Sequence, residues 1–302
     1  GKNPGAINVA LSDGVKFKQA KTMGYIHAPY YWFPVMGDVN GDNRNDICYF
    51  NPNANRVWIL FASEEGFTEK KIENIEGNIG SAKTTFLYDI NSDGKDDLLF
   101  GSKIENRNET AWFIAYSEGD AFSDPVPAGK TISSNTYLIG NITGENAPEF
   151  VVLNEVTNRW DVYQLRNDQL KPLQSFSGSS SVNADVSSFF MYDVDGDAKD
   201  DLVSWDKEGS CVWFVNYSTG TEFNKEVKWI NNHHAASMKN NITPPENGFI
   251  GSMDGKKSIA MVLSFGKWTG VEFTGKDKTE SPTIIDTYES WGADYIPEGG
   301  TY

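Results

Sequence analysis

The sequence is poor in the residues that several functional classes require. Its 302 residues include only three histidines and two cysteines, and Asp and Glu outnumber Lys and Arg by 42 to 26. The resulting formal net charge of −16 argues against nucleic-acid binding, because phosphate recognition needs clustered Lys and Arg side chains. The same negative charge argues against an anionic membrane surface. No apolar run approaches the ~18 residues of a membrane-spanning helix.

Neither the two cysteines nor any familiar catalytic motif points to a reaction. Cys48 and Cys211 each lie in an apolar stretch at positions that do not correspond, so we expect two buried free thiols. The sequence lacks a P-loop, a dinucleotide-binding fingerprint and a nucleophile elbow. A carboxylate pair for glycoside hydrolysis stays open as an alternative. We therefore expect a binding or scaffold protein more than an enzyme.

What the sequence does contain is a repeat of about 52 residues with an acidic loop in each copy. The loops begin at Asp38, Asp89, Asn141, Asp193 and Ser252, the last copy being degenerate. An apolar run with a tryptophan follows each loop, and these tryptophans are Trp58, Trp112, Trp160, Trp213 and Trp268. Self-similarity at such a period is the signature of a repeat architecture.

Each repeat has the pattern of four short strands. In the first repeat the expected strands are residues 33–38, 46–50, 57–63 and 67–72, with turn residues between them. Four strands per repeat of this length fit a propeller blade. We predict an all-β, single-domain β-propeller over residues 1–302 with four-stranded antiparallel blades, five in number with six as the alternative. The predicted repeats lie near 37–80, 88–130, 140–178, 192–230 and 251–274, and an N-terminal half-blade at 7–20 closes the ring.

The acidic loops have the spacing of calcium ligands. Calcium takes about 6–8 oxygen ligands in flexible geometry, and alternate residues of a tightly curled loop converge on one point. Position 7 of each loop is basic and offers only its backbone carbonyl. Three loops have this pattern, which predicts about three calcium ions. The predicted ligand residues are Asp38, Asn40, Asp42, Arg44 and Asp46; Asp89, Asn91, Asp93, Lys95 and Asp97; and Asp193, Asp195, Asp197, Lys199 and Asp201.

Two other interpretations of these loops were weighed. An EF-hand needs Glu at position 12, where this chain has Tyr49, Phe100 and Ser204. A metal-free turn rich in Asp and Asn is possible for one loop, but three such loops at a constant period favour a cation. In the third repeat, Asn141, Thr143, Glu145 and Glu149 form a weaker set, and the fifth repeat is shortened. We expect no tight site in either, and we expect calcium to raise the melting temperature by binding the folded state.

The segments GDVNGDNRND, YDINSDGKDD and YDVDGDAKDD, each followed by a strand and then a tryptophan-containing strand, resemble the FG-GAP/VCBS repeat family of integrin-α-like propellers. The resemblance covers roughly residues 37–274 and implies the propeller fold and calcium. It implies less about function, because the family includes adhesion domains, lectin-like propellers and modules of secreted enzymes. Family propellers often have seven blades, and this chain is too short for seven.

The remaining candidates are aromatic and histidine side chains in loops. Tyr30, Tyr31 and Trp32 precede a strand, while Trp229, His233 and His234 lie in or beside the long irregular segment 231–247. Aromatic faces bind sugars and protein anchors, although a hydrophobic seal between blades is the favoured interpretation of the first group and a solvated polar loop that of the second. We expect a secreted, periplasmic or cell-surface module that binds a glycan or an extracellular protein. The alternative is a secreted polysaccharide lyase or hydrolase, or its accessory domain.

Overall fold

The structure, a computed structural model, forms two compact units. One consists of Gly1–Val9, Lys21–Asn141 and Glu145–Phe176, and the other of Ala10–Ala20, Ile142–Gly144 and Ser177–Tyr302; below they are unit 1 and unit 2. The residues that the structure describes are 5–11, 18–26, 33–51, 56–73, 75, 84–104, 107, 109–145, 147–173, 178–179, 187–206, 212–228, 248–252, 258–264, 267–272 and 284–288.

Unit 1 contains a two-stranded hairpin and three larger sheets. The hairpin is β1 (Gly5–Val9) and β2 (Lys21–Ile26), and each larger sheet follows chain order along its path. The strands of the larger sheets are β3 (Phe33–Gly37), β4 (Asp46–Asn51), β5 (Arg56–Ala62) and β6 (Phe67–Glu73); β7 (Thr85–Tyr88), β8 (Asp97–Lys103), β9 (Thr110–Ala115) and β10 (Val126–Ile132); and β11 (Tyr137–Gly140), β12 (Glu149–Asn154), β13 (Arg159–Arg166) and β14 (Gln169–Pro172).

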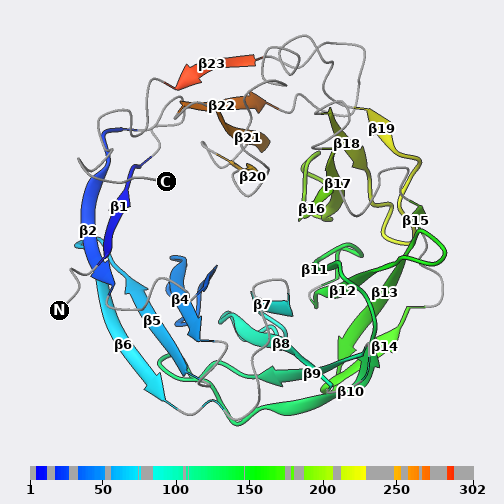
Figure 1. The fold of residues 1–302 in the computed structure, drawn as a ribbon, viewed down its shortest axis with the longest axis horizontal. Coiled ribbons are helices and arrows are strands. Elements are labelled where there is room, and N and C mark those ends of the chain that lie inside the picture. Colours follow the sequence, from blue (N-terminus) through cyan, green and yellow to red (C-terminus); the bar gives the residue numbers. More distant parts are fainter. Residues whose placement is uncertain are drawn as a thin grey trace. The chain divides into compact units, whose positions relative to one another are not determined.

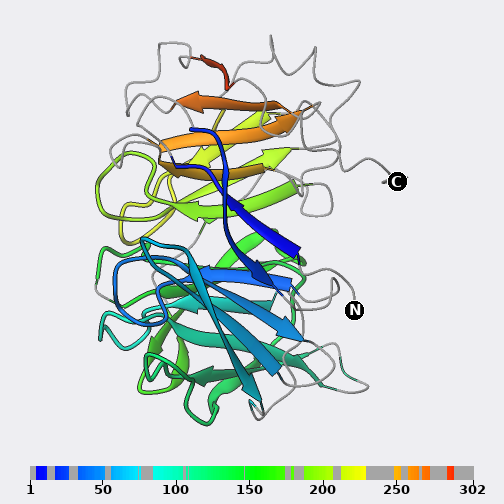
Figure 2. The same cartoon turned by 90° about the vertical axis from the view of Figure 1, so that its left-hand side faces the viewer.

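Unit 2 repeats this plan in two sheets. The strands of unit 2 are β15 (Gly178–Ser179); β16 (Ser187–Tyr192), β17 (Asp201–Asp206), β18 (Val212–Asn216) and β19 (Val227–Lys228); and β20 (Gly248–Ser252), β21 (Ser258–Ser264), β22 (Lys267–Glu272) and β23 (Ile284–Tyr288). All pairings along β16–β19 and β20–β23 are antiparallel and join strands that are consecutive in the chain. Figure 1 shows this order within each sheet, and Figure 2 shows β20, β21 and β22 (orange) lying side by side.

Neighbouring sheets meet in the manner of propeller blades. Within unit 1 the first strands β3 and β7 are neighbours, as are the fourth strands β10 and β14, and β2 lies beside β6. Within unit 2 the first strands β16 and β20 are neighbours. Sheets that meet in this way, each built from four consecutive antiparallel strands, are propeller blades, and the predicted fold class is confirmed.

The number of four-stranded sheets differs from the five blades predicted. Among the described residues four sheets have four strands each, and a fifth, larger sheet has β11-β12-β13-β14 as its path. The N-terminal strands run over Gly5–Val9 and Lys21–Ile26 where residues 7–20 were expected to form a half-blade. Closure of a ring by that half-blade, and a single domain over the whole chain, stay predictions.

The core explains why a tryptophan recurs in the third strand of the repeats. Trp112 is 1% exposed, and its ring centroid lies 4.5 Å from that of Phe150 in the next sheet of unit 1. Trp213 is 3% exposed and stacks on Trp205 of the neighbouring strand at 5.3 Å. Such aromatic pairs add about 0.5–1.5 kcal/mol to the gain from burial. Trp112 and Trp213 are therefore core residues and not exposed platforms for a ligand. Cys48 is buried and free, as predicted, while Cys211 lies outside the described residues.

Candidate metal centre

Each of the three acidic loops joins the first strand of a sheet to the second. The residue before the loop pairs with the ninth residue of the loop: Gly37 with Asp46, Tyr88 with Asp97, and Tyr192 with Asp201. An apolar residue at position 2 of each loop enters the core, and these residues are Val39, Ile90 and Val194. The loops are therefore turns of antiparallel hairpins that are anchored at the second and ninth positions.

The first aspartate of each loop closes the turn. In the loop at 193–201, Asp193 Oδ1 accepts hydrogen bonds from the backbone N–H groups of Gly196 (2.7 Å) and Asp197 (3.1 Å), and its Oδ2 accepts one from Ala198 (2.9 Å). In the loop at 38–46, Asp38 accepts from Gly41, Asp42 and Asn43 in the same way. These bonds curl the backbone around the first carboxylate, as the ligand spacing predicts.

The third and fifth residues also face the inside of the turn. The side-chain Oδ1 of Asn40, Asn91 and Asp195 accepts the N–H of the fifth residue, at 2.9, 2.9 and 3.2 Å. The Oδ1 of the fifth residue then accepts the N–H of the seventh, at 2.9–3.0 Å. Three consecutive odd positions are thus held on one side of the loop by the backbone itself.

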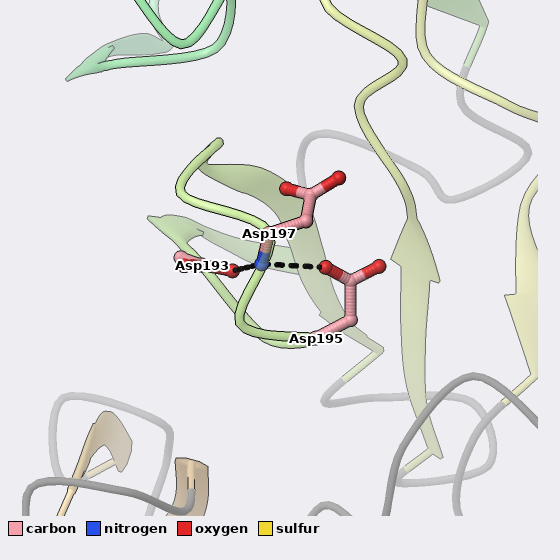
Figure 3. A group of neighbouring side chains, drawn as sticks. All are labelled: Asp193, Asp195 and Asp197. Atoms are coloured by element: carbon pink, nitrogen blue, oxygen red, sulfur yellow. Dashed lines mark hydrogen bonds between the residues drawn. The ribbon is translucent and has the colours of Figure 1, made fainter.

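In the loop at 193–201 these side chains form a group with the donor set of a metal site. One carboxylate oxygen from each of Asp193, Asp195 and Asp197 lies within 4.8 Å of the others, and all three residues are half-buried. Figure 3 shows the three carboxylates along one curl of the turn. Three carboxylate oxygens suit a hard cation such as calcium. The loops at 38–46 and 89–97 have Asn at the third position and offer an amide oxygen there.

The side chain of the basic residue at position 7 pairs with the carboxylate at position 5, which was not predicted from the sequence. The Lys199 ammonium lies 2.7 Å from Asp197 Oδ2, and the Lys95 ammonium lies 2.6 Å from Asp93 Oδ2. The Arg44 guanidinium lies 3.4 Å from Asp42 Oδ2. The Lys95 ammonium donates a hydrogen bond to the Asp93 carboxylate and thereby lowers the pKa of that carboxyl. The seventh side chain is therefore a built-in counter-ion of the fifth.

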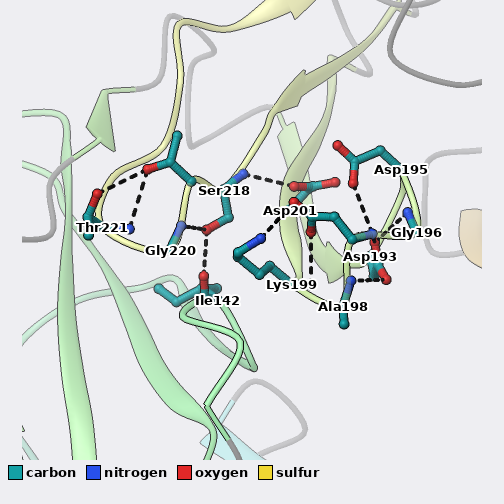
Figure 4. A network of polar contacts seen from close by, with 12 residues as sticks. Ile142, Asp193, Asp195, Gly196, Ala198, Lys199, Asp201, Ser218, Gly220 and Thr221 are labelled. Carbon is teal, nitrogen blue, oxygen red and sulfur yellow. Dashed lines mark hydrogen bonds and ion pairs between the residues drawn. The ribbon is translucent and has the colours of Figure 1, made fainter.

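The ninth residues are buried structural carboxylates as well as predicted ligands. Asp46, Asp97 and Asp201 are 0% exposed. Asp201 Oδ2 accepts the N–H of Val194 (3.1 Å) and its Oδ1 accepts that of Ser218 (2.8 Å); Figure 4 includes the bond to Ser218. Burial raises the pKa of Asp46 and Asp97 to about 6 and that of Asp201 to about 7. The structure thus ties the ninth residue to two backbone amides, and Asp201 does not join the group of three.

The third loop differs in its charge balance. Glu145 Oε2 accepts hydrogen bonds from the Arg166 guanidinium (2.8 Å) and from the Gln164 amide (3.2 Å). Glu149, at the ninth position, is fully buried. An arginine from β13 therefore pairs with the carboxylate at position 5, as the seventh residue does in the other three loops. What sets the third loop apart is Asn141 and Thr143 at its first and third positions, which offer no carboxylate, and the expectation of no tight cation site there stays a prediction. In the fifth repeat, Asp254 lies outside the described residues.

The predicted ligand-binding residues cannot be placed. Tyr30, Tyr31, Trp32, Trp229, His233 and His234 all lie outside the described residues, so their role stays a prediction. In the part of the chain that the structure describes, no helix has the length and apolar character needed to cross a membrane.

Comparison with known proteins supports the repeat and the fold. The family model of the FG-GAP-like repeat matches residues 38–100, a span that contains the first two acidic loops. The resemblance to that repeat is therefore confirmed in this span, and the sheets are those of an FG-GAP repeat propeller. Comparison with curated proteins gives no significant match.

Solved structures with a similar fold include proteins that act on or bind carbohydrate. An Agrocybe aegerita lectin, solved for its recognition of non-reducing terminal N-acetylglucosamine, is 16% identical with a TM-score of 0.58, over 83% of this chain and 65% of the lectin. An exo-β-1,3-galactanase from Phanerochaete chrysosporium is 9% identical with a TM-score of 0.46, over 94% of this chain and 67% of that one. This chain thus spans slightly less than two thirds of the lectin. At 16% identity the likeness to the lectin shows the fold alone.

Proposed function

We propose that this protein is a calcium-binding propeller that serves outside the cytoplasm as a glycan-binding module. The observation that supports calcium most directly is the group of Asp193, Asp195 and Asp197, whose carboxylate oxygens lie within 4.8 Å of one another. The same backbone geometry recurs in the loops at 38–46 and 89–97. The expected content is one ion in each of these three loops.

The chemistry of the donors favours calcium over other divalent ions. The candidate ligands are carboxylate, amide and backbone carbonyl oxygens, and the predicted set includes no His or Cys, which zinc prefers. Flexible turns with mixed donors suit the larger calcium ion better than magnesium, which demands a near-ideal octahedron. When bound, the ion would offset the negative charge of the carboxylates at the first and fifth positions, and of Asp195 at the third position of the loop at 193–201. The role of the bound ion would then be to stabilise the hairpin turns and not to take part in catalysis.

Support for a glycan ligand comes from the fold and from the aromatic loops. The Agrocybe aegerita lectin shares the fold with a TM-score of 0.58. The candidate ligand-binding residues remain Tyr30, Tyr31, Trp32, Trp229, His233 and His234, because aromatic rings stack on sugar faces. Calcium modules of low affinity operate where calcium is plentiful, as outside cells, which supports a secreted, periplasmic or cell-surface location.

The deciding experiment is binding of the folded protein to a broad glycan array, first in calcium and then in chelator. Selective binding that weakens in chelator is the expected result. Trp32→Ala should then abolish it, while the control variant Val156→Ala, which changes an exposed residue of another loop, should not. A blank array with folded, calcium-loaded protein would overturn the glycan ligand and favour a protein partner. Turnover of a polysaccharide would instead indicate an enzyme.

A further inference from the structure

The acidic loops at 38–46 and 89–97 are joined directly to each other within unit 1. Asp96, the eighth residue of the second loop, contacts Asp38, the first residue of the first loop, at two points. The Asp38 N–H donates to Asp96 Oδ2 at 2.7 Å, and the Asp96 N–H donates to the Asp38 carbonyl at 2.7 Å. The backbone on both sides of the Asp38 side chain is therefore set by a residue of the other loop.

Ser117, at the end of β9, makes a second connection between the same loops. Its hydroxyl donates to the Val39 carbonyl at 2.6 Å, and its N–H donates to Asp97 Oδ1 at 2.8 Å. Val39 in turn donates its N–H to Asp46 Oδ2 at 3.2 Å. A continuous line of buried hydrogen bonds thus links the ninth residue of one loop to the ninth residue of the next.

The backbones of the two loops also approach closely. A Cβ on Gly37 would lie 2.6 Å from Asp96 Oδ2, and a Cβ on Gly41 would lie 3.0 Å from the Gly94 carbonyl oxygen. Gly41 also has a φ of +75°, which disfavours a larger residue. With so little free space, the first loop cannot move without displacing the second, because packed interfaces tend to switch between discrete arrangements rather than deform continuously.

We infer that Asp96 and Ser117 couple these two loops, so that a calcium ion in either loop raises the affinity of the other. This inference rests on the proposed calcium binding. An ion held by Asp89, Asn91 and Asp93 fixes the loop that contains Asp96, and Asp96 then holds Asp38 in place before the second ion arrives. The second ion thus binds to a turn that is already ordered, so less conformational entropy is lost when it binds. Asp96 is outside the predicted ligand sets, and its negative charge between the loops offsets the repulsion between the two cations.

The loop at 193–201 supplies an internal comparison. Ser218 repeats the serine connection, because its hydroxyl donates to the Ile142 carbonyl at 2.5 Å and its N–H donates to Asp201 (Figure 4). The partner loop is here the third one, which has Asn141 and Thr143 at its first and third positions and is expected to hold no tight site. We therefore expect the ion of the loop at 193–201 to bind independently.

The test is calcium titration by calorimetry in an Asp195→Ala background, which leaves the two coupled loops. We expect cooperative binding with a Hill coefficient above 1. Asp96→Ala should bring the coefficient to about 1 and weaken the mean affinity about tenfold, within the usual range of allosteric coupling. The matched control is Asn45→Ala, the exposed residue at position 8 of the first loop, which should change neither quantity. Cooperativity that survives Asp96→Ala, or independent sites in the parent, would overturn the inference.

Ser117→Ala is the second variant, because the first blade has Ala62 at the corresponding place, where its N–H donates to Asp46. Alanine is therefore compatible with the local backbone, and we expect a folded protein with a smaller loss of cooperativity than in Asp96→Ala.

Amide hydrogen exchange in chelator separates this inference from the proposed function. Asp96→Ala should speed exchange at Val39 and Asn43 of the other loop, and Asn45→Ala should not. Unchanged exchange would disprove the connection itself, whereas absence of calcium binding in the wild type would overturn the proposed function and the coupling together.

Discussion

At the scale of single residues, the acidic turns need a left-handed backbone at two positions. The fourth and sixth residues of all three loops have positive φ: +75°, +62° and +78° at Gly41, Ser92 and Gly196, and +62°, +84° and +66° at Asn43, Gly94 and Ala198. Left-handed geometry costs an L-residue about 1–2 kcal/mol, least for Asn and Asp, whose side chains hydrogen-bond locally. Ser92 and Ala198 are therefore strained.

Replacing these residues by glycine should stabilise the protein in a graded way. We expect Ala198→Gly to raise the free energy of unfolding by about 1 kcal/mol, because relief of strain exceeds the added entropy of the unfolded chain. Ser92→Gly should give a similar gain and Asn43→Gly a smaller one. Urea denaturation of the three variants measures the differences. Equal gains at all three positions, or a loss at Ala198, would contradict the assignment of strain.

The residues that sequence reasoning missed act through neighbours that the chain brings together only on folding. Asp96 lies 58 positions from Asp38, and Ser117 lies 78 positions from Val39. The spacing of the ligands is a local property and could be seen in each loop by itself. The basic residue at position 7 was visible in three copies, and its recurrence was the signal that its side chain, and not only its carbonyl, has a role.

At the scale of the elements, the third loop keeps the shape of the other acidic turns with fewer carboxylates. Its turn retains the buried position 2 at Ile142 and the buried ninth residue Glu149. The change lies at the first and third positions, where Asn141 and Thr143 stand in place of the residues of the predicted ligand sets. Arg166 of β13 reaches Glu145 at 2.8 Å, so the fifth position keeps a basic partner, as it does in the other loops.

Calcium stoichiometry should distinguish the third loop from the fourth. We expect Asp195→Ala to lower the number of bound ions by one, because it removes a ligand from the group of three carboxylates. Glu145→Ala should leave the number unchanged, since Asn141 and Thr143 at the first and third positions of its loop offer no carboxylate. Equilibrium dialysis with metal analysis of both variants and the wild type provides the count. Loss of an ion from Glu145→Ala would show that the third loop also binds calcium.

The strands could be predicted because their cause is local. The first sheet has strands at Phe33–Gly37, Asp46–Asn51, Arg56–Ala62 and Phe67–Glu73, close to the predicted residues 33–38, 46–50, 57–63 and 67–72. Alternating or continuous apolar runs between turn residues indicate such strands. The number of sheets and the pairing of the N-terminal strands depend on contacts between distant segments. No local pattern encodes such contacts.

At the scale of the whole molecule, the repeat places the same buried acid in several blades. Asp46, Asp97 and Asp201 are each 0% exposed, and burial raises their pKa values to about 6, 6 and 7. Each unit of upward shift corresponds to about 1.4 kcal/mol in favour of the neutral form. In an acidic protein of net charge −16, the ionised forms add to the general repulsion.

These acids predict a pH dependence that calcium should suppress. The folded pKa values exceed those of the unfolded chain, so the stabilising protons are bound at about pH 4 and are lost as the pH rises through about 6 to 7. In chelator we expect the melting midpoint to fall by several degrees between about pH 5.5 and pH 8. Calcium binds ionised carboxylates in the folded state alone, and at 100 times its dissociation constant it adds about 2.7 kcal/mol per site.

The measurement is a series of melting curves from about pH 5 to pH 8, in chelator and in millimolar calcium. Calcium should raise the midpoint most at pH 8, where the carboxylates are ionised, and so flatten the profile. Asp201→Asn removes the group with the highest pKa and should reduce the fall between about pH 6 and pH 8 in chelator. A midpoint that rises with pH in chelator would contradict the cost assigned to the buried acids. A profile unaffected by calcium would show that the turns owe their shape to the backbone alone.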